Sequence, residues 1–162
     1  METPNKKKSY ENTVEVVASA LIIKGDKILL IKSHKWGDAY LLPGGHVEHK
    51  DTILEAAKRE GEEETGLKLK PLYCVNLGEE INDPRFHRKA HFIYFHVVCE
   101  ALNNKINLDN RELKDFIWIS PKEALKLPTL KGHKTIQNYI DGINMVFNSK
   151  KYLKMDLKKS HW

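Results

Sequence analysis

The sequence lacks the features of a membrane protein or of a disulfide-stabilised protein. Its longest apolar run, from Val16 to Ile23 with Ser19 inside it, is far shorter than the ~20 residues that a membrane-spanning helix needs. Its two cysteines, Cys74 and Cys99, form no Cys-x-x-Cys pair, which argues against a metal knuckle and a disulfide framework. No apolar segment follows the first lysines before Val14, so we expect no secretory signal and a cytoplasmic location.

Internal repeats and linkers are also missing, which indicates a single domain. The chain has 162 residues, of which 41% are hydrophobic, and this is enough for one core. We expect a flexible basic N-terminus over residues 1–13, one domain over 14–147 and a basic C-terminal tail over 148–162. Much of the net charge of +5 lies in the two ends, which we interpret as solvated rather than as a nucleic-acid interface.

Strand and helix patterns are mixed along the chain. Apolar and β-branched segments predict strands over residues 14–23, 28–31, 40–42, 69–77, 91–98 and 116–119. Thr52 and Glu55 match a capping box that begins a helix, and Gly66 ends it. Ser120 begins a short helix to about residue 127, and a last helix is expected over 133–147. Regular βαβ alternation is absent, so we predict a mixed α/β domain.

The helix that follows Thr52 concentrates negative charge in an otherwise basic chain. At about 100° per residue, Glu60, Glu63 and Glu64 continue its apolar stripe, whereas Glu62 lies opposite and is expected to be solvated. Carboxylates on the face turned toward the protein need a cation or a pairing partner. Three that converge from one helix face suit a hard divalent cation, Mg²⁺ or Mn²⁺.

Residues beside these acids extend the candidate site. Arg59 could hold Glu60 ionised and oriented through a charge-assisted hydrogen bond, although an ordinary surface pair is the alternative. Gly44 and Gly45 let the backbone turn tightly and approach a ligand closely, although a plain turn would need the same residues.

The stretch from Gly45 to Leu67 resembles the Nudix box, Gly-x5-Glu-x7-Arg-Glu-U-x-Glu-Glu-x-Gly-U, in which U is a bulky aliphatic residue. The positions in register are Gly45, Arg59, Glu60, Glu63, Glu64, Gly66 and Leu67. The spacing is long and therefore specific. The resemblance covers roughly residues 14–147 and implies the Nudix α/β/α sandwich with a mixed sheet.

Two positions depart from the box. Asp51 stands where the box has glutamate, so its shorter side chain puts an ion pair with Arg59 in question. Gly61 replaces the aliphatic residue, and a glycine inside a helix costs about 1 kcal/mol relative to alanine. We expect looser packing behind the acids and room for a larger side chain at Gly61.

The resemblance implies metal-dependent hydrolysis of a nucleoside diphosphate linked to another moiety. It implies Glu63 and Glu64 as the main ligands of Mg²⁺ or Mn²⁺, joined by Glu60 and the Gly45 carbonyl. It also implies a catalytic role for Glu60, Glu64 and Arg59, with Glu60 as an alternative base. A further ligand is expected from a later loop, where Glu112 is preferred over Glu79, Glu80 and Asp83.

The substrate is expected to be a small nucleotide. Trp36 and Phe86 could stack on its base and Arg88 could meet its phosphates, although packing and surface roles are equally common for such residues. The short chain favours a nucleoside-triphosphate pyrophosphohydrolase that releases a nucleoside monophosphate and pyrophosphate. An ADP-ribose or nucleotide-sugar pyrophosphatase is the alternative.

Two other classes of function stay open at this point. A non-catalytic nucleotide sensor predicts lost glutamates, yet Glu60, Glu63 and Glu64 are present. An RNA-processing protein would use the lysine-rich tail as an anchor, yet that tail holds few aromatic residues. The sequence leaves the oligomeric state open, and a homodimer is one alternative.

Overall fold

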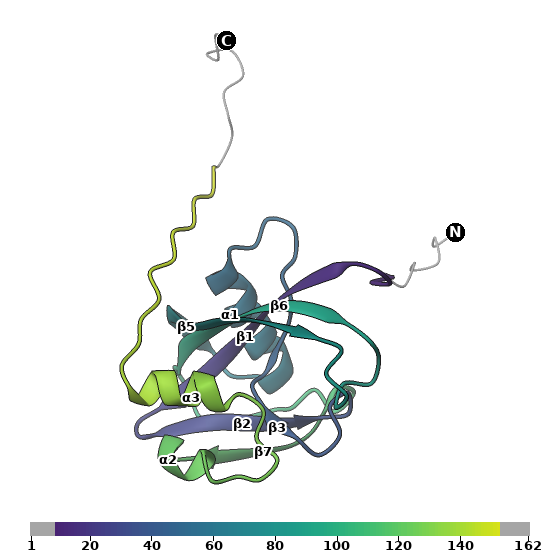
Figure 1. Ribbon diagram of the computed structural model, residues 1–162. Helices are drawn as coiled ribbons and strands as arrows, with labels where there is room; N and C mark the ends of the chain where they lie inside the picture. Colours follow the sequence, from purple (N-terminus) through teal and green to yellow (C-terminus); the bar gives the residue numbers. More distant parts are fainter. Residues whose placement is uncertain (1–8, 153–162) are drawn as a thin grey trace, which may run out of the picture.

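The computed structural model describes residues 9–152 and has a seven-stranded mixed sheet at its centre (Figure 1). Five strands lie in the order β3-β2-β1-β6-β5, while β4 pairs with β1 and β7 pairs with β2. The β1–β6 pair is parallel and the other strand pairs are antiparallel. The strands are β1 (Val14–Lys24), β2 (Lys27–Ser33), β3 (Tyr40–Leu41), β4 (Gly44–His46), β5 (Leu69–Ile81), β6 (His91–Ala101) and β7 (Leu113–Ile119).

The long helix α1 (Ile53–Thr65) begins and ends as the sequence predicts. Its capping box is complete, because Glu55 N donates to Thr52 Oγ1 at 3.2 Å and Thr52 N donates to Glu55 Oε2 at 2.8 Å. Gly66 follows with a φ of 73°, a left-handed conformation that favours glycine. Local contacts alone therefore fix the ends of the helix that carries the acidic residues.

Helices cover both faces of the sheet, which confirms the predicted α/β/α arrangement. One core lies between α1 and the sheet and includes Ala20, Ile22 and Ala57. The other lies beneath α2 (Pro121–Ala124) and α3 (His133–Ile140) and includes Leu21 and Ile136. Neighbouring residues of β1 enter opposite cores because successive strand side chains point to opposite faces.

The predicted C-terminal helix is wrong in length. α3 ends at Ile140, and Gly142, with a φ of 71°, turns the chain away. Met145 N then donates to Cys74 O at 2.8 Å, so this segment runs in extended form beside β5. The pairing satisfies backbone groups of an edge strand, which a periodicity pattern cannot anticipate.

Gly44 and Gly45 also differ from their prediction, since they belong to strand β4 and pair with Ser19 and Ala18 of β1. The predicted basic ends fall in part on residues 1–8 and 153–162, outside the described residues. Within residues 9–152, the helices are too short and too polar to cross a membrane.

Candidate active site

A cleft of about 340 Å³ lies beside β4 and the first turn of α3. Trp36, Phe86, Phe92 and Tyr94 supply aromatic surface, and residues 44–46 and 131–135 line it as well. This volume is within the range of pockets that bind small organic ligands.

Strand β4 brings the acidic helix to this cleft. Gly44 N donates to Glu64 Oε2 at 3.1 Å, which links the strand to the last turn of α1. A Cβ placed on Gly45 would lie 2.6 Å from the carboxyl carbon of Glu60. No larger residue fits at Gly45 unless Glu60 moves, so the glycine allows the carboxylate to approach the backbone closely.

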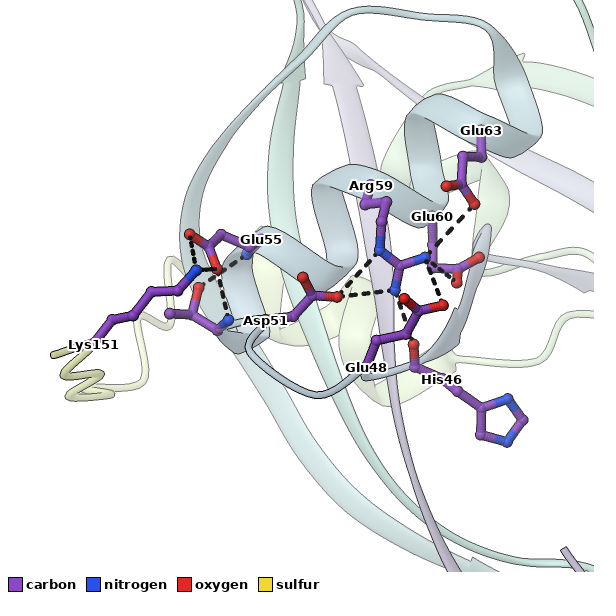
Figure 2. A network of polar contacts seen from close by, with 9 residues as sticks. His46, Glu48, Asp51, Glu55, Arg59, Glu60, Glu63 and Lys151 are labelled. Carbon is purple, nitrogen blue, oxygen red and sulfur yellow. Dashed lines mark hydrogen bonds and ion pairs between the residues drawn. The ribbon is translucent and has the colours of Figure 1, made fainter. Parts of the chain in front are cut away.

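Arg59 is the centre of the polar network that Figure 2 shows around α1. Its Nη1 donates to Glu60 Oε1 at 2.8 Å, its Nε to Asp51 Oδ2 at 3.1 Å and its Nη2 to His46 O at 3.1 Å. Glu63 Oε2 lies 3.6 Å from Nη1. The aspartate at position 51 therefore reaches Arg59 despite its shorter side chain. The guanidinium holds Glu60 in place and ties α1 to β4.

Burial and mutual repulsion perturb the two inner carboxylates. Burial raises the pKa of Glu60, and the charges of Glu63 and Glu112 add to that rise, although Arg59 opposes it. Burial raises the pKa of Glu64 well above its ordinary value, and the charges of Glu60 and Glu112 contribute. Glu112 is thus close enough to act electrostatically on both groups. A cation at this place would relieve the repulsion.

The donor set fits a hard divalent cation in its chemistry, because it consists of carboxylates beside a backbone carbonyl. In residues 9–152, however, no three His, Cys, Asp or Glu side chains are already grouped to hold a metal ion. Glu60 is bonded to Arg59, the side chain of Glu63 is 61% exposed, and Glu112 lies 3.6 Å from Lys35 Nζ. Closing a ligand set would require rotation of such exposed side chains.

The family model described as the NUDIX domain matches residues 13–139. The chain belongs to the Nudix family. Glu60, Glu63 and Glu64 of its Nudix box lie on α1, as the resemblance implies.

Similar proteins support the assignment to this family. A probable DHNTP pyrophosphohydrolase of Lactococcus lactis is 38% identical over 99 residues, which are 59% of either chain. The diphosphoinositol polyphosphate phosphohydrolase 2 of Rattus norvegicus is 27% identical over 150 residues, or 88% of this chain and 78% of the rat protein. A NUDIX hydrolase structure from Nitrosomonas europaea superposes with a TM-score of 0.67 at 23% identity, covering 86% of this chain and 97% of that one. That structure supports the Nudix fold.

The alternative metal ligands that the sequence offers have basic partners in this Nudix protein, and Glu80 lines the cleft together with its partner Lys131. Glu79 pairs with His91 at 2.8 Å, while Glu80 and Asp83 both pair with Lys131. Glu62 differs from its prediction, since its carboxylate accepts from Leu69 N at 2.9 Å. That bond connects α1 to the first residue of β5.

The expected substrate contacts divide into two groups. Trp36 and Phe86 line the cleft, with their ring centroids 4.4 Å apart. Arg88 is not among the lining residues, and its guanidinium donates to both oxygens of Glu15 at 2.6 and 2.9 Å. Burial opposes the ionisation of Glu15, but the bonds from Arg88 and His46 lower its pKa overall. The geometry gives Arg88 a structural partner in Glu15.

Sequence reasoning missed the inner wall of the cleft. Asn76, Tyr94 and His96 line it from β5 and β6, Lys131 lines it from the segment before α3, and Thr135 lines it from the first turn of α3. Tyr94 and His96 are two residues apart on a strand and therefore share a face. Polar residues at that spacing could have indicated the wall, but nothing local places Thr135 opposite them.

Proposed function

We propose that this Nudix protein hydrolyses a nucleoside triphosphate to a nucleoside monophosphate and pyrophosphate, with Mg²⁺ or Mn²⁺ as cofactor. One observation carries the proposal: the carboxylates of Glu60 and Glu64 meet the Gly44–Gly45 end of a cleft that also presents aromatic side chains. With a divalent cation bound by the carboxylates, that arrangement suits a ligand with an anionic end and a flat end. A relative named as a probable pyrophosphohydrolase supports the choice of reaction.

The metal would be held by Glu60, Glu63, Glu64, Glu112 and the carbonyl of Gly45. When bound, a divalent cation neutralises phosphate oxygens and lowers the pKa of water. Oxygen ligands alone make Mg²⁺ or Mn²⁺ the fitting choice.

The protein's own residues would orient and deprotonate the water. Arg59 binds Glu60 through Oε1, which leaves Oε2 to accept a proton from the attacking water. The raised pKa of Glu60 brings this base closer to neutrality. The water oxygen attacks the phosphorus atom next to the nucleoside. The bond from that phosphorus to the bridging oxygen breaks, and pyrophosphate leaves with the electron pair. Glu64, bonded to Gly44, would fix the distance between α1 and β4 during this step.

A substrate panel with product separation tests the proposal. The four ribonucleoside triphosphates, their deoxy forms, ADP-ribose and a diphosphoinositol polyphosphate are incubated with enzyme and Mg²⁺, and products are separated by ion exchange. We expect a monophosphate and pyrophosphate from at least one triphosphate. A far higher kcat/KM for ADP-ribose or for the inositol compound than for every triphosphate would contradict the proposed substrate.

Three variants test the site itself. Glu63→Gln and Glu64→Gln should remove most turnover while the fold stays intact by circular dichroism. Glu79→Gln is the matched control, because Glu79 pairs with His91 and does not line the cleft. Full activity of either site variant, or of the wild type in excess chelator, would refute the assignment of the metal site.

A further inference from the structure

Three polar side chains from three elements meet on the inner wall of the cleft. Asn76 of β5 lies directly opposite His96 of β6 in the antiparallel register. Asn76 Nδ2 donates to Thr135 Oγ1 at 2.9 Å, and the same oxygen lies 2.5 Å from His96 Nδ1. All three residues line the cleft. Thr135 therefore joins the two strand residues through one hydroxyl group.

The Thr135 hydroxyl is the hydrogen-bond partner of His96 Nδ1. Burial and the charge of Lys131 lower the pKa of His96 to about 3, so the ring is neutral and carries a single proton. Thr135 Oγ1 accepts from Asn76, and its own hydrogen can point to His96 Nδ1. In that arrangement Nδ1 is the acceptor and the ring proton is on Nε2, whereas in the opposite tautomer Nδ1–H would donate to the second lone pair of the hydroxyl.

The two remaining polar atoms are open to the cleft. Among the described residues, Asn76 Oδ1 and His96 Nε2 have no protein hydrogen-bond partner. No fully buried side-chain nitrogen or oxygen in residues 9–152 lacks a partner, so both atoms are accessible. Both residues line the cleft, so with the ring proton on Nε2 it presents an acceptor and a donor side by side.

We propose that Asn76 Oδ1 and His96 Nε2 recognise the edge of a heterocyclic base, and that Thr135 sets the polarity of this pair. The inference rests on the proposed function, since it names which part of a nucleotide enters this end of the cleft. An acceptor beside a donor matches a ring edge that carries an N–H donor next to a C=O or N acceptor. Nucleobases and related fused heterocycles have such an edge, whereas phosphorylated inositols offer only hydroxyls and phosphates.

The surrounding rings favour a flat ligand as well. Tyr94 stacks on His96 with ring centroids 4.8 Å apart and planes tilted by 26°. A Cβ on Gly78 would lie 2.1 Å from the Tyr94 hydroxyl oxygen, so glycine is required for this ring position. Trp36 and Phe86 line the same cleft. Aromatic walls around one donor and one acceptor suit a planar base better than a saturated ring.

Two variants of Thr135 separate recognition from general damage. Kinetics are compared on the best nucleoside triphosphate and on ribose 5-triphosphate, which has the same phosphates but no base. Thr135→Val should lower kcat/KM for the nucleotide by about tenfold to a hundredfold, which is the range for lost hydrogen bonds in a buried site. For ribose 5-triphosphate, the same variant should change kcat/KM by less than about twofold. Thr135→Ser, which keeps the hydroxyl, should stay close to wild type. Equal losses on both substrates would overturn the proposal.

Histidine nitrogen shifts measured by NMR test the polarity without any turnover. The wild type should show His96 protonated on Nε2. In Asn76→Asp the introduced carboxylate takes the Thr135 hydrogen, so the His96 proton should move to Nδ1 and donate to Thr135 Oγ1. A wild-type proton on Nδ1 would overturn the proposal.

A nucleoside without phosphates separates this inference from the proposed function. Titration with guanosine and adenosine should shift the His96 Nε2 resonance in the wild type and not in Thr135→Val. If no triphosphate were hydrolysed but this shift appeared, recognition of the base would stand and the proposed reaction would fall. If triphosphates were hydrolysed while neither nucleoside moved the resonance, the reaction would stand and this inference would fall.

Discussion

Gly61 gives the sharpest test of how α1 packs on the sheet. The sequence suggests that leucine at this position would restore helix propensity and fill empty space. The structure contradicts the second part of that expectation. A Cβ on Gly61 would lie 2.6 Å from Leu69 Cδ1 and 3.2 Å from Ala20 Cβ. The side chain of Leu69 already occupies the space that the box usually gives to an aliphatic residue at Gly61.

The two opposing contributions can be compared. Replacing glycine inside a helix gains about 1 kcal/mol. Overpacking a filled core costs about 1–3 kcal/mol, and the contact with Ala20, which cannot rotate away, places leucine at the upper end. We expect Gly61→Leu to destabilise the fold by about 2 kcal/mol, or about 4–8 °C in melting temperature for a chain of this size. Gly61→Ala adds only one carbon, which Leu69 can accommodate by a small rotation, so it should melt within about 2 °C of wild type.

Thermal unfolding followed by circular dichroism measures these differences. The matched control is Gly61→Leu combined with Leu69→Ala, which removes the clashing methyl groups. Leu69→Ala alone should cost about 2–5 kcal/mol because it opens a cavity. The double variant should cost less than the sum of the two single changes. A melting temperature of Gly61→Leu at or above wild type would refute the packing argument.

Three further predictions concern the charged groups. Arg88→Ala should cost about 1–3 kcal/mol and leave KM within about twofold of wild type, because Arg88 neutralises buried Glu15. Folding lowers the pKa of Glu15, so its stabilising contribution is present above pH 4.5 and disappears as the pH falls. In denaturant titrations at several pH values, the free energy of unfolding of the variant should therefore fall less steeply with acid than that of the wild type. Glu64→Gln should have a higher melting temperature than the wild type in chelator at pH 7.5, because the raised pKa of Glu64 makes the stability of the wild type fall as the pH rises above 4.5. A difference in melting temperature that persisted well below pH 4.5 would contradict this cause. Arg59→Lys should lower kcat at least about tenfold with little change in KM, because one ammonium group cannot replace the planar guanidinium that holds Glu60. An unchanged kcat would show that Arg59 does not orient Glu60.

Local chemistry explains why part of the structure could be predicted. Thr52, Glu55 and Gly66 fix the ends of α1 through bonds between residues close in sequence. Helical periodicity correctly predicts Glu60 and Glu64 on the inward face of α1, but it wrongly predicts Glu63 there, since that side chain is 61% exposed. The box spacing and the two-residue alternation of the strands are local patterns as well. Identity as a Nudix protein therefore follows from sequence.

Contacts between distant segments explain the failures. α3 stops at Ile140 because the following segment pairs with Cys74 of β5, and Glu62 is bonded because Leu69 lies beside it. The sequence around Arg88 looks like a basic surface cluster, yet strand β1 brings the carboxylate of Glu15 within hydrogen-bond distance of Arg88. No short-range rule specifies such partners.

The sequence by itself determined the acidic helix, its glycine neighbours and the mixed class of the fold, because these depend on spacing along the chain. Only the tertiary structure decided that Leu69 fills the space beside Gly61, and that Asn76, His96 and Thr135 share one wall of the cleft. These groups come from β5, β6 and α3. Their meeting depends on sheet register and helix packing, which are set by burial across the whole domain and not by any neighbouring residue.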